Sequence, residues 1–221
     1  MIRVRNQEDQ VNVPDWVSDL ESFRRWTETD DFPEKEDIGF LKGEVWVDMS
    51  GEQIYTHNQV KAEFTFVLIG LTKASRRGRY FPDGVLLSNA EVDFTSGPDG
   101  LYVSYRSLEG GDVRQVEGAQ QGFVEFEGAP EMALEVVSDS SVEKDTVTLR
   151  DLYWQASIKE YWLVDARDEK LEFEILRHTA KGYAPTRKRD RWIRSTVFGR
   201  SFRLTRRPDR LGNPAYRLAV R

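Results

Sequence analysis

Apolar side chains recur at helical spacing in three parts of the chain. The spacing predicts helices over residues 14–26, about 52–74 and 145–157. Pro14 suits a first helical turn, and Asp145 is the expected N-cap of the third helix. The positions expected to face the core are Trp16, Leu20, Phe23 and Trp26 in the first helix, and Val60, Phe64, Val67, Leu68 and Leu71 in the second.

The remaining apolar runs are short and favour strands. A hairpin is predicted over 38–50 around Lys42-Gly43, after a polar segment at 27–37, and two short strands over 80–94 around a turn. Further strands are expected at 97–108, 130–137, 160–166 and 170–178, with a loop rich in glycine and charge at 109–128. This order predicts an α/β or α+β layer arrangement with a mixed central sheet.

We divide the chain into three parts. Residues 1–37 form an N-terminal helical extension, residues 38–180 the core, and residues 181–221 a basic C-terminal β segment packed on it. With 221 residues, of which 39% are hydrophobic, the chain can bury a sizeable core. It has no cysteine, which excludes disulfides and thiolate metal sites. The absence of a signal-like start and of a long apolar run favours a cytoplasmic protein.

Charge is distributed unevenly along the chain. The formal net charge is −6, yet residues 187–221 contain 12 basic and 2 acidic residues. A basic segment on an acidic body suggests a polyanion partner. The alternative is that these arginines line the solvent face of a half-buried hairpin, in which Phe202 and Leu204 point inward.

The stretch PEMALEVVSDSSVEKD, residues 130–145, places a carboxylate inside an apolar strand. Strand alternation puts Glu135 on one face with Ala133 and Val137. Burying an ionised carboxylate is costly unless a cation or several donors compensate. Glu135 therefore either holds a metal ion or pairs with a cation such as Arg150.

A divalent-metal site needs a second oxygen ligand nearby. Pro-Asp-Gly occurs twice, at 82–84 and at 98–100, and each copy is also typical of a turn. Residue types alone do not choose between Asp83 and Asp99.

A longer pattern resembles a known family. GPDGLYVS, GAPEMALEVVSDSS and KDTVTLRDLYWQASIKEYWLVDAR, with LKGEVWVDMS and THNQV upstream, resemble the Uma family of restriction endonuclease-like proteins, a branch of the PD-(D/E)XK nuclease superfamily. The resemblance runs from about Ile38 to Leu176.

The resemblance implies a restriction-endonuclease-like fold, in which helices flank a mixed four-stranded core sheet. The family's Pro-Asp falls on Pro98-Asp99 and its strand glutamate on Glu135. These two carboxylates, with the backbone carbonyl of Val136, would hold one Mg²⁺ or Mn²⁺. By this similarity Asp83 is only a turn residue.

The catalytic lysine of the superfamily has no direct counterpart. Its strand position is Val137, and the helix position used by the Uma branch is Leu149. Arg150 would point about 100° away from that helix position. Lys144 is the best remaining candidate, and the alternative is that it is a solvated surface lysine.

Three further features match the family more weakly. Glu44 could add a carboxylate to the metal side, and His57 could assist a water molecule or contact phosphate. A cap, a salt bridge or a surface position is the alternative for both. The serines of SDSS, residues 138–141, would cap the following helix or contact phosphate.

The leading hypothesis is a metal-dependent endonuclease that hydrolyses phosphodiester bonds in DNA. It would act as a homodimer if it cuts both strands. A second hypothesis is a nuclease-fold protein that binds nucleic acid without catalysis. A third is a protein-interaction module, in which the six tryptophans contribute to a homodimer face.

Overall fold

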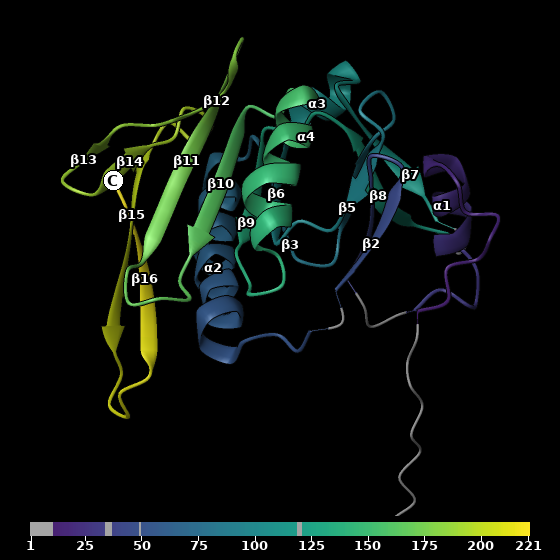
Figure 1. Cartoon of the computed structure of the whole chain (residues 1–221). Coiled ribbons are helices and arrows are strands. Elements are labelled where there is room, and N and C mark those ends of the chain that lie inside the picture. The colour runs from purple at the N-terminus through teal and green to yellow at the C-terminus, as the bar shows by residue number, and fades with distance from the viewer. Residues whose placement is uncertain (1–10, 34–36, 49, 119–120) are drawn as a thin grey trace, which may run out of the picture.

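The computed structural model describes residues 11–33, 37–48, 50–118 and 121–221 (Figure 1). Parts of the expected N-terminal extension, the polar segment, the hairpin and the glycine-rich loop lie outside the described residues. The helices are α1 (Leu20–Thr27), the π-helical turn η1 (Ile54–Asn58), α2 (Gln59–Ser75), α3 (Tyr105–Gly110), the π-helical turn η2 (Lys144–Thr148) and α4 (Leu149–Gln155). None of the described helices has the length and apolar character needed to cross a membrane.

The strands form three sheets. The first has the order β12 (Gly182–Pro185), β11 (Glu172–Thr179), β10 (Glu160–Asp165), β9 (Met132–Val136), β6 (Gly100–Ser104) and β3 (Gly78–Pro82). The second has the order β2 (Glu44–Asp48), β1 (Asp37–Leu41), β5 (Phe94–Ser96), β4 (Leu86–Asn89), β8 (Phe123–Gly128) and β7 (Val113–Glu117). The third has the order β13 (Lys188–Arg189), β14 (Trp192–Arg194), β15 (Ser201–Pro208) and β16 (Pro214–Val220).

The first sheet carries the expected mixed core. β3, β6 and β9 are antiparallel neighbours, and β9 pairs with β10 in parallel. Alternation along β9 separates two apolar layers. Leu134 and Val136 pack toward Phe64 of α2, while Ala133 packs toward Leu152 of α4 on the other face. The predicted mixed α/β architecture with helices on both faces is confirmed.

The third sheet packs on the α2 side of the first. Phe202 and Leu204 belong to the apolar layer that includes Trp162 of β10. The fully buried Glu160 ties the two sheets together, because its carboxylate accepts hydrogen bonds from the Ser195 hydroxyl (2.7 Å) and from the Thr196 backbone N–H (2.5 Å). The C-terminal β segment is thus anchored to the core by both apolar and polar contacts.

The first predicted helix begins later than expected. α1 starts at Leu20 because the Asp19 side chain accepts a hydrogen bond from the Ser22 N–H (2.7 Å) and caps the helix there. Trp16 is therefore 48% exposed, whereas Trp26 is buried against Phe40 of the second sheet.

Two other predicted connections were wrong. Pro82-Asp83-Gly84 does not close a hairpin, because β3 and β4 belong to different sheets and the segment crosses between them. The expected loop at 109–128 contains the end of α3 and the paired strands β7 and β8. Both differences arise from pairing between strands that are distant in the chain, which residue composition does not predict.

Candidate active site

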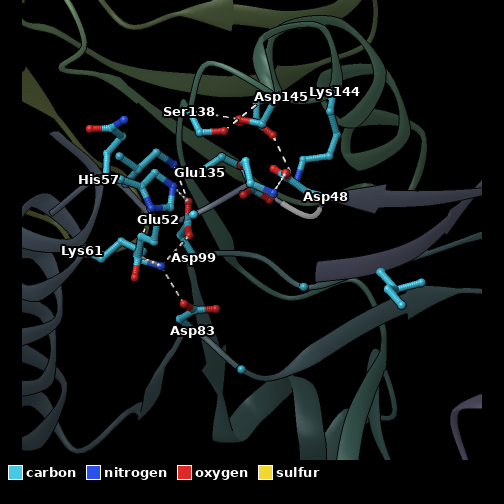
Figure 2. Close-up of a pocket in the computed structure, with 18 of the residues that line it drawn as sticks. Asp48, Glu52, His57, Lys61, Asp83, Asp99, Glu135, Ser138, Lys144 and Asp145 are labelled. Atoms are coloured by element: carbon cyan, nitrogen blue, oxygen red, sulfur yellow. Dashed lines mark hydrogen bonds and ion pairs between the residues drawn. The ribbon is translucent and has the colours of Figure 1, made fainter. Parts of the chain in front are cut away.

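A pocket of about 460 Å³ opens between the two six-stranded sheets (Figure 2). Its walls come from the end of β2, the start of α2, the β3–β4 crossing, the residues before β6, the end of β9 and the start of η2. The pocket collects six carboxylates together with two lysines: Asp48, Glu52, Asp83, Asp99, Glu135, Asp145, Lys61 and Lys144.

The first expected ligand, Asp99, lies directly before β6. The backbone pairing between β6 and β9 ends at Gly100 and Leu134. Beyond it, the Val136 N–H donates a hydrogen bond to Asp99 Oδ2 at 2.7 Å. Since the N–H and C=O of one strand residue point to the same side, the Val136 carbonyl also points toward this edge. The structure thus brings Asp99 and the backbone of Val136 together, as the sequence pattern predicted.

The second expected ligand, Glu135, is only 2% exposed. The Tyr153 hydroxyl of α4 donates to its Oε1 at 2.7 Å. The alternative prediction, that Glu135 pairs with Arg150, is wrong, because the Arg150 guanidinium donates a hydrogen bond to the Tyr183 backbone carbonyl (3.4 Å). Burial, and then the negative charge of Asp145, raise the pKa of Glu135 well above its usual value, whereas Lys144 opposes the rise. Ionised Glu135 is therefore disfavoured in the folded protein, first by its burial and then by its acidic neighbours.

Asp145 is an acidic neighbour that the sequence analysis assigned to a different role. It is not an N-cap. It is buried inside the η2 turn, where its carboxylate accepts a hydrogen bond from the Ser141 hydroxyl, and its backbone carbonyl accepts one from the Tyr161 hydroxyl (2.8 Å). A helix-start pattern alone could not show that this side chain faces the Glu135 strand.

Lys144 lies inside the pocket wall rather than in solvent. Its side chain is 8% exposed, its Nζ lies 3.7 Å from Asp145 Oδ1, and it sits 4.1 Å from the centre of the Trp46 ring. The surface-lysine alternative is therefore wrong. Val137 and Leu149, the two positions where the superfamily carries lysine, are buried apolar side chains as the sequence indicated.

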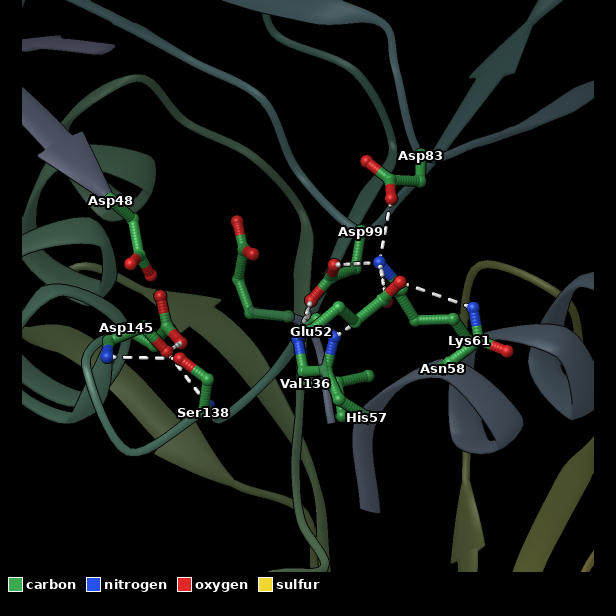
Figure 3. Close-up of polar contacts among 12 residues, drawn as sticks. Asp48, Glu52, His57, Asn58, Lys61, Asp83, Asp99, Val136, Ser138 and Asp145 are labelled. Atoms are coloured by element: carbon green, nitrogen blue, oxygen red, sulfur yellow. Dashed lines mark hydrogen bonds and ion pairs between the residues drawn. The ribbon is translucent and has the colours of Figure 1, made fainter. Parts of the chain in front are cut away.

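A cationic group reaches Asp99 from the η1 turn that precedes α2 (Figure 3). His57 Nε2 lies 3.5 Å from Asp99 Oδ2, and its Nδ1 lies 3.0 Å from Glu52 Oε1. Burial disfavours the imidazolium, but Asp99 and Glu52 outweigh it and raise the pKa of His57 to about 9. The structure thus places His57 beside the metal-side aspartate.

Lys61 is a site residue that the sequence analysis missed. Its Nζ lies 3.5 Å from Asp99 Oδ1 and 2.7 Å from Asp83 Oδ2, and it also contacts Glu52. The only signal in the sequence is its spacing, since a residue four positions after His57 shares its helix face. Asp83, expected to be a plain turn residue, enters the site through this lysine.

Some expected contributors lie elsewhere. Glu44 is exposed at the start of β2 and does not line the pocket, whereas Asp48, at the other end of that strand, does. The SDSS serines, in contrast, stand at the pocket: Ser138 and Ser141 line it. They form a local turn, in which the Ser138 N–H donates to Ser141 Oγ (2.9 Å) and Ser140 Oγ donates to Asp48 (2.5 Å). None of the described residues from 187 to 221 lines this pocket.

The donor set fits a divalent cation in an open site. Among the described residues, no three histidine or carboxylate side chains converge into a closed metal cage. Mg²⁺ does not require one, since it is commonly held by one or two carboxylates and completes its shell with water and phosphate. Asp99, Glu135 and the Val136 carbonyl offer such a partial shell, and a bound cation would compensate the buried carboxylate of Glu135.

The fold is similar to that of a solved structure. A crystal structure from Anabaena variabilis ATCC 29413, described as "a putative nuclease belonging to DUF820", superposes with a TM-score of 0.61 over 82% of this chain and 90% of that chain. The two are 15% identical, so the likeness shows a shared fold. No curated protein matches the chain. The fold and the acidic pocket define a restriction-endonuclease-like protein.

The sequence itself assigns the family. The model of the Uma2 family, described as "Putative restriction endonuclease", matches residues 20–207, and the chain belongs to this family. The resemblance inferred from the sequence motifs is confirmed, and family membership supports a nuclease function.

Proposed function

We propose that this protein is a metal-dependent endonuclease that hydrolyses phosphodiester bonds in DNA. The observation that carries the proposal is the meeting of Asp99 and Glu135 in one pocket, with Asp99 held by the Val136 N–H and Glu135 held by Tyr153. Asp99 lies directly before β6 and Glu135 on the neighbouring β9, and a hydrogen bond from Val136 or Tyr153 fixes the position of each carboxylate. Rigid placement of ligands is what a catalytic site requires.

Each residue of the pocket has a distinct role in the proposed reaction. Asp99, Glu135 and the Val136 carbonyl would hold Mg²⁺ or Mn²⁺, which when bound polarises a phosphate and makes a water molecule more acidic. Tyr153 orients Glu135 through its hydroxyl. Lys61 and Lys144 stand on two sides of the carboxylates, and either ammonium group could stabilise the charge that develops on the phosphate.

His57 adds to this positive edge. Against the effect of burial, Asp99 and Glu52 raise its pKa to about 9 in the metal-free protein, which favours the imidazolium, a charged donor. A protonated histidine beside Lys61 makes the α2 side of the pocket attractive to a phosphate oxygen. The α2 side therefore serves to position the substrate.

The test is cleavage of supercoiled plasmid DNA with Mg²⁺ or Mn²⁺. Asp99→Asn and Glu135→Gln should each abolish nicking, while their melting temperatures show that they remain folded. Asp139→Asn is the matched control, because this aspartate pairs with Arg167 outside the pocket and its side chain is 79% exposed. Undiminished nicking by both pocket variants would refute the proposal.

A second candidate is a nuclease-fold protein that binds DNA without cutting it. The observation in its favour is that Lys61 and His57 already ion-pair with Asp99, while Val137 and Leu149 are apolar. Calorimetric titration with Mn²⁺ separates the two candidates. A nuclease site takes up one Mn²⁺ in a manner that depends on Asp99 and Glu135, and a site closed by its own cations takes up none.

A further inference from the structure

The molecule has a second polar hollow, far from the acidic pocket. It measures about 490 Å³ and is lined on the third sheet and its edge by Thr186, Thr196 and Ser201 hydroxyls, by Trp192, and by five arginines. No acidic residue lines it. The arginines are Arg177, Arg187, Arg189, Arg194 and Arg221.

Strand register brings distant arginines to this hollow. Arg194 of β14 pairs with Ser201 of β15, and the backbones of Ser201 and Arg221 exchange hydrogen bonds of 2.9 and 3.0 Å. Residues directly opposite one another share a face of the sheet, so both guanidinium groups extend on the same side. The inner face of these strands carries Ile193 and Phe202, which are buried in the core. The arginine face is thus the outer one.

Trp192 stiffens the arrangement. The guanidinium carbons of Arg203 and Arg221 lie 4.7 and 4.3 Å from the centre of its ring. Stacking of this kind holds an arginine side chain in place while leaving its N–H donors at the rim of the ring free to bind oxygen atoms.

The positive charge in the hollow has no internal counterpart. All five lining arginines are exposed, and within the described ranges of the chain none of them forms an ion pair with a carboxylate. The whole chain carries −6, so this segment is basic against its background. Several guanidinium groups that repel one another around one hollow favour a bound polyanion, and their planar donors match phosphate oxygens.

We propose that the arginine hollow binds the phosphate backbone of DNA at a place separate from the catalytic pocket. Arg177 lies opposite Glu160 at the start of β10, whereas Glu135 and Val136 lie near the end of β9, so the two sites are at opposite ends of the parallel strands. Figure 1 shows β13 and β14 beside the C-terminus, away from the start of α2. The proposal rests on the proposed function only for the identity of the polyanion.

A bound DNA segment in the hollow contacts the protein through phosphate and without base readout. Of the lining side chains, only Trp192 is aromatic, and its ring is already occupied by two guanidinium groups. Binding should therefore be insensitive to base sequence and strongly dependent on salt. It retains DNA on the enzyme independently of events at the catalytic pocket.

The test uses the full chain carrying Asp99→Asn, in EDTA, so that neither cleavage nor metal binding contributes. Fluorescence anisotropy with a labelled DNA duplex is measured over a series of salt concentrations. The hollow variant combines Arg189→Gln, Arg194→Gln and Arg221→Gln. The matched control combines Arg207→Gln, Arg210→Gln and Arg217→Gln, which remove the same charge from exposed positions of the same sheet outside the hollow.

The hollow variant should bind at least about tenfold more weakly, and the slope of log affinity against log salt should fall by about 2 to 3. The control should retain most of the affinity and slope. If both variants lost DNA affinity equally, net charge alone would explain the loss and the proposal would be overturned. Unchanged DNA affinity in both variants would also overturn it. Hollow-dependent binding of inorganic triphosphate or of anionic phospholipid vesicles, with DNA affinity unchanged, would also overturn it. Because cleavage plays no part, failure of the catalytic proposal leaves this result intact.

Discussion

Replacing Glu135 by glutamine should stabilise the metal-free protein at neutral pH. The glutamate is buried, and its carboxylate faces the negative charges of Asp145 and Asp99. Glutamine has nearly the same shape and keeps an oxygen that accepts the Tyr153 hydroxyl, so the variant removes the charge and little else. A carboxyl group with a raised pKa is costly to ionise in the folded protein.

The sign of the pH dependence follows from this shift. Below the ordinary pKa of 4.5, Glu135 is protonated in both the folded and the unfolded chain and contributes nothing. As the pH rises from 4.5 toward the higher pKa of the folded state, the unfolded chain loses the proton first, and the wild-type protein loses stability. The advantage of Glu135→Gln should therefore be absent in acid, grow as the pH rises above 4.5, and reach its full size above the raised pKa of the folded state.

The magnitude follows from the burial and the single neutral donor. Leaving a buried polar group poorly compensated costs about 1–3 kcal/mol. For a chain of this length, about 1 kcal/mol moves the melting temperature by about 2–4 °C, so Glu135→Gln should melt about 2–12 °C higher in EDTA at alkaline pH. A divalent cation reverses the order, since Mn²⁺ at about 1,000 times its Kd adds about 4.1 kcal/mol to the wild type alone.

Differential scanning fluorimetry in EDTA and in Mn²⁺, over a range of pH, measures both effects. The expected pattern is a crossing, with the variant more stable in EDTA and the wild type more stable in Mn²⁺. A lower melting temperature for Glu135→Gln than for the wild type in EDTA would refute the inference that ionised Glu135 destabilises the metal-free fold. Equal shifts of both proteins by Mn²⁺ would refute Glu135 as a ligand.

Three further predictions concern cations around the sheets. Lys61→Met and Lys144→Met test which lysine stabilises the charge on the phosphate during cleavage. The variant that lacks this lysine should nick plasmid DNA about 10²-fold more slowly. Full activity in both variants would show that neither lysine has this role. His57→Gln should remove a pH dependence of stability in EDTA, because the imidazolium stabilises the wild-type fold below pH 6.5 and that contribution is lost as the pH rises through about 9; parallel melting curves for the two proteins would contradict the ion pairs. Arg24→Ala should cost about 2–3 kcal/mol in chemical denaturation, since it leaves the buried Glu125 without its cationic partner. The exposed Arg25→Ala should change stability little.

Local patterns along the chain were sufficient for the elements that build the site. Strand alternation in residues 130–137 placed Glu135 on one face and Met132 and Leu134 on the other, and the structure agrees. Helical spacing found the buried face of α2, including Val60 and Phe64. Such patterns work because each side chain's direction depends on its own backbone geometry.

The composition of the pocket depended on long-range packing. Asp145 faces Glu135, and Lys61 reaches Asp99 from a different segment, although neither contact is marked by spacing in the chain. The β3–β4 crossing likewise left a turn-like motif at Asp83 inside the pocket, because those strands pair into different sheets. The sequence by itself determined the elements with strong apolar periodicity, such as α2 and β9, and their buried faces, but not β7 and β8. Only the tertiary structure decided which charges meet, because that depends on strand pairing and on contacts between residues far apart in the chain.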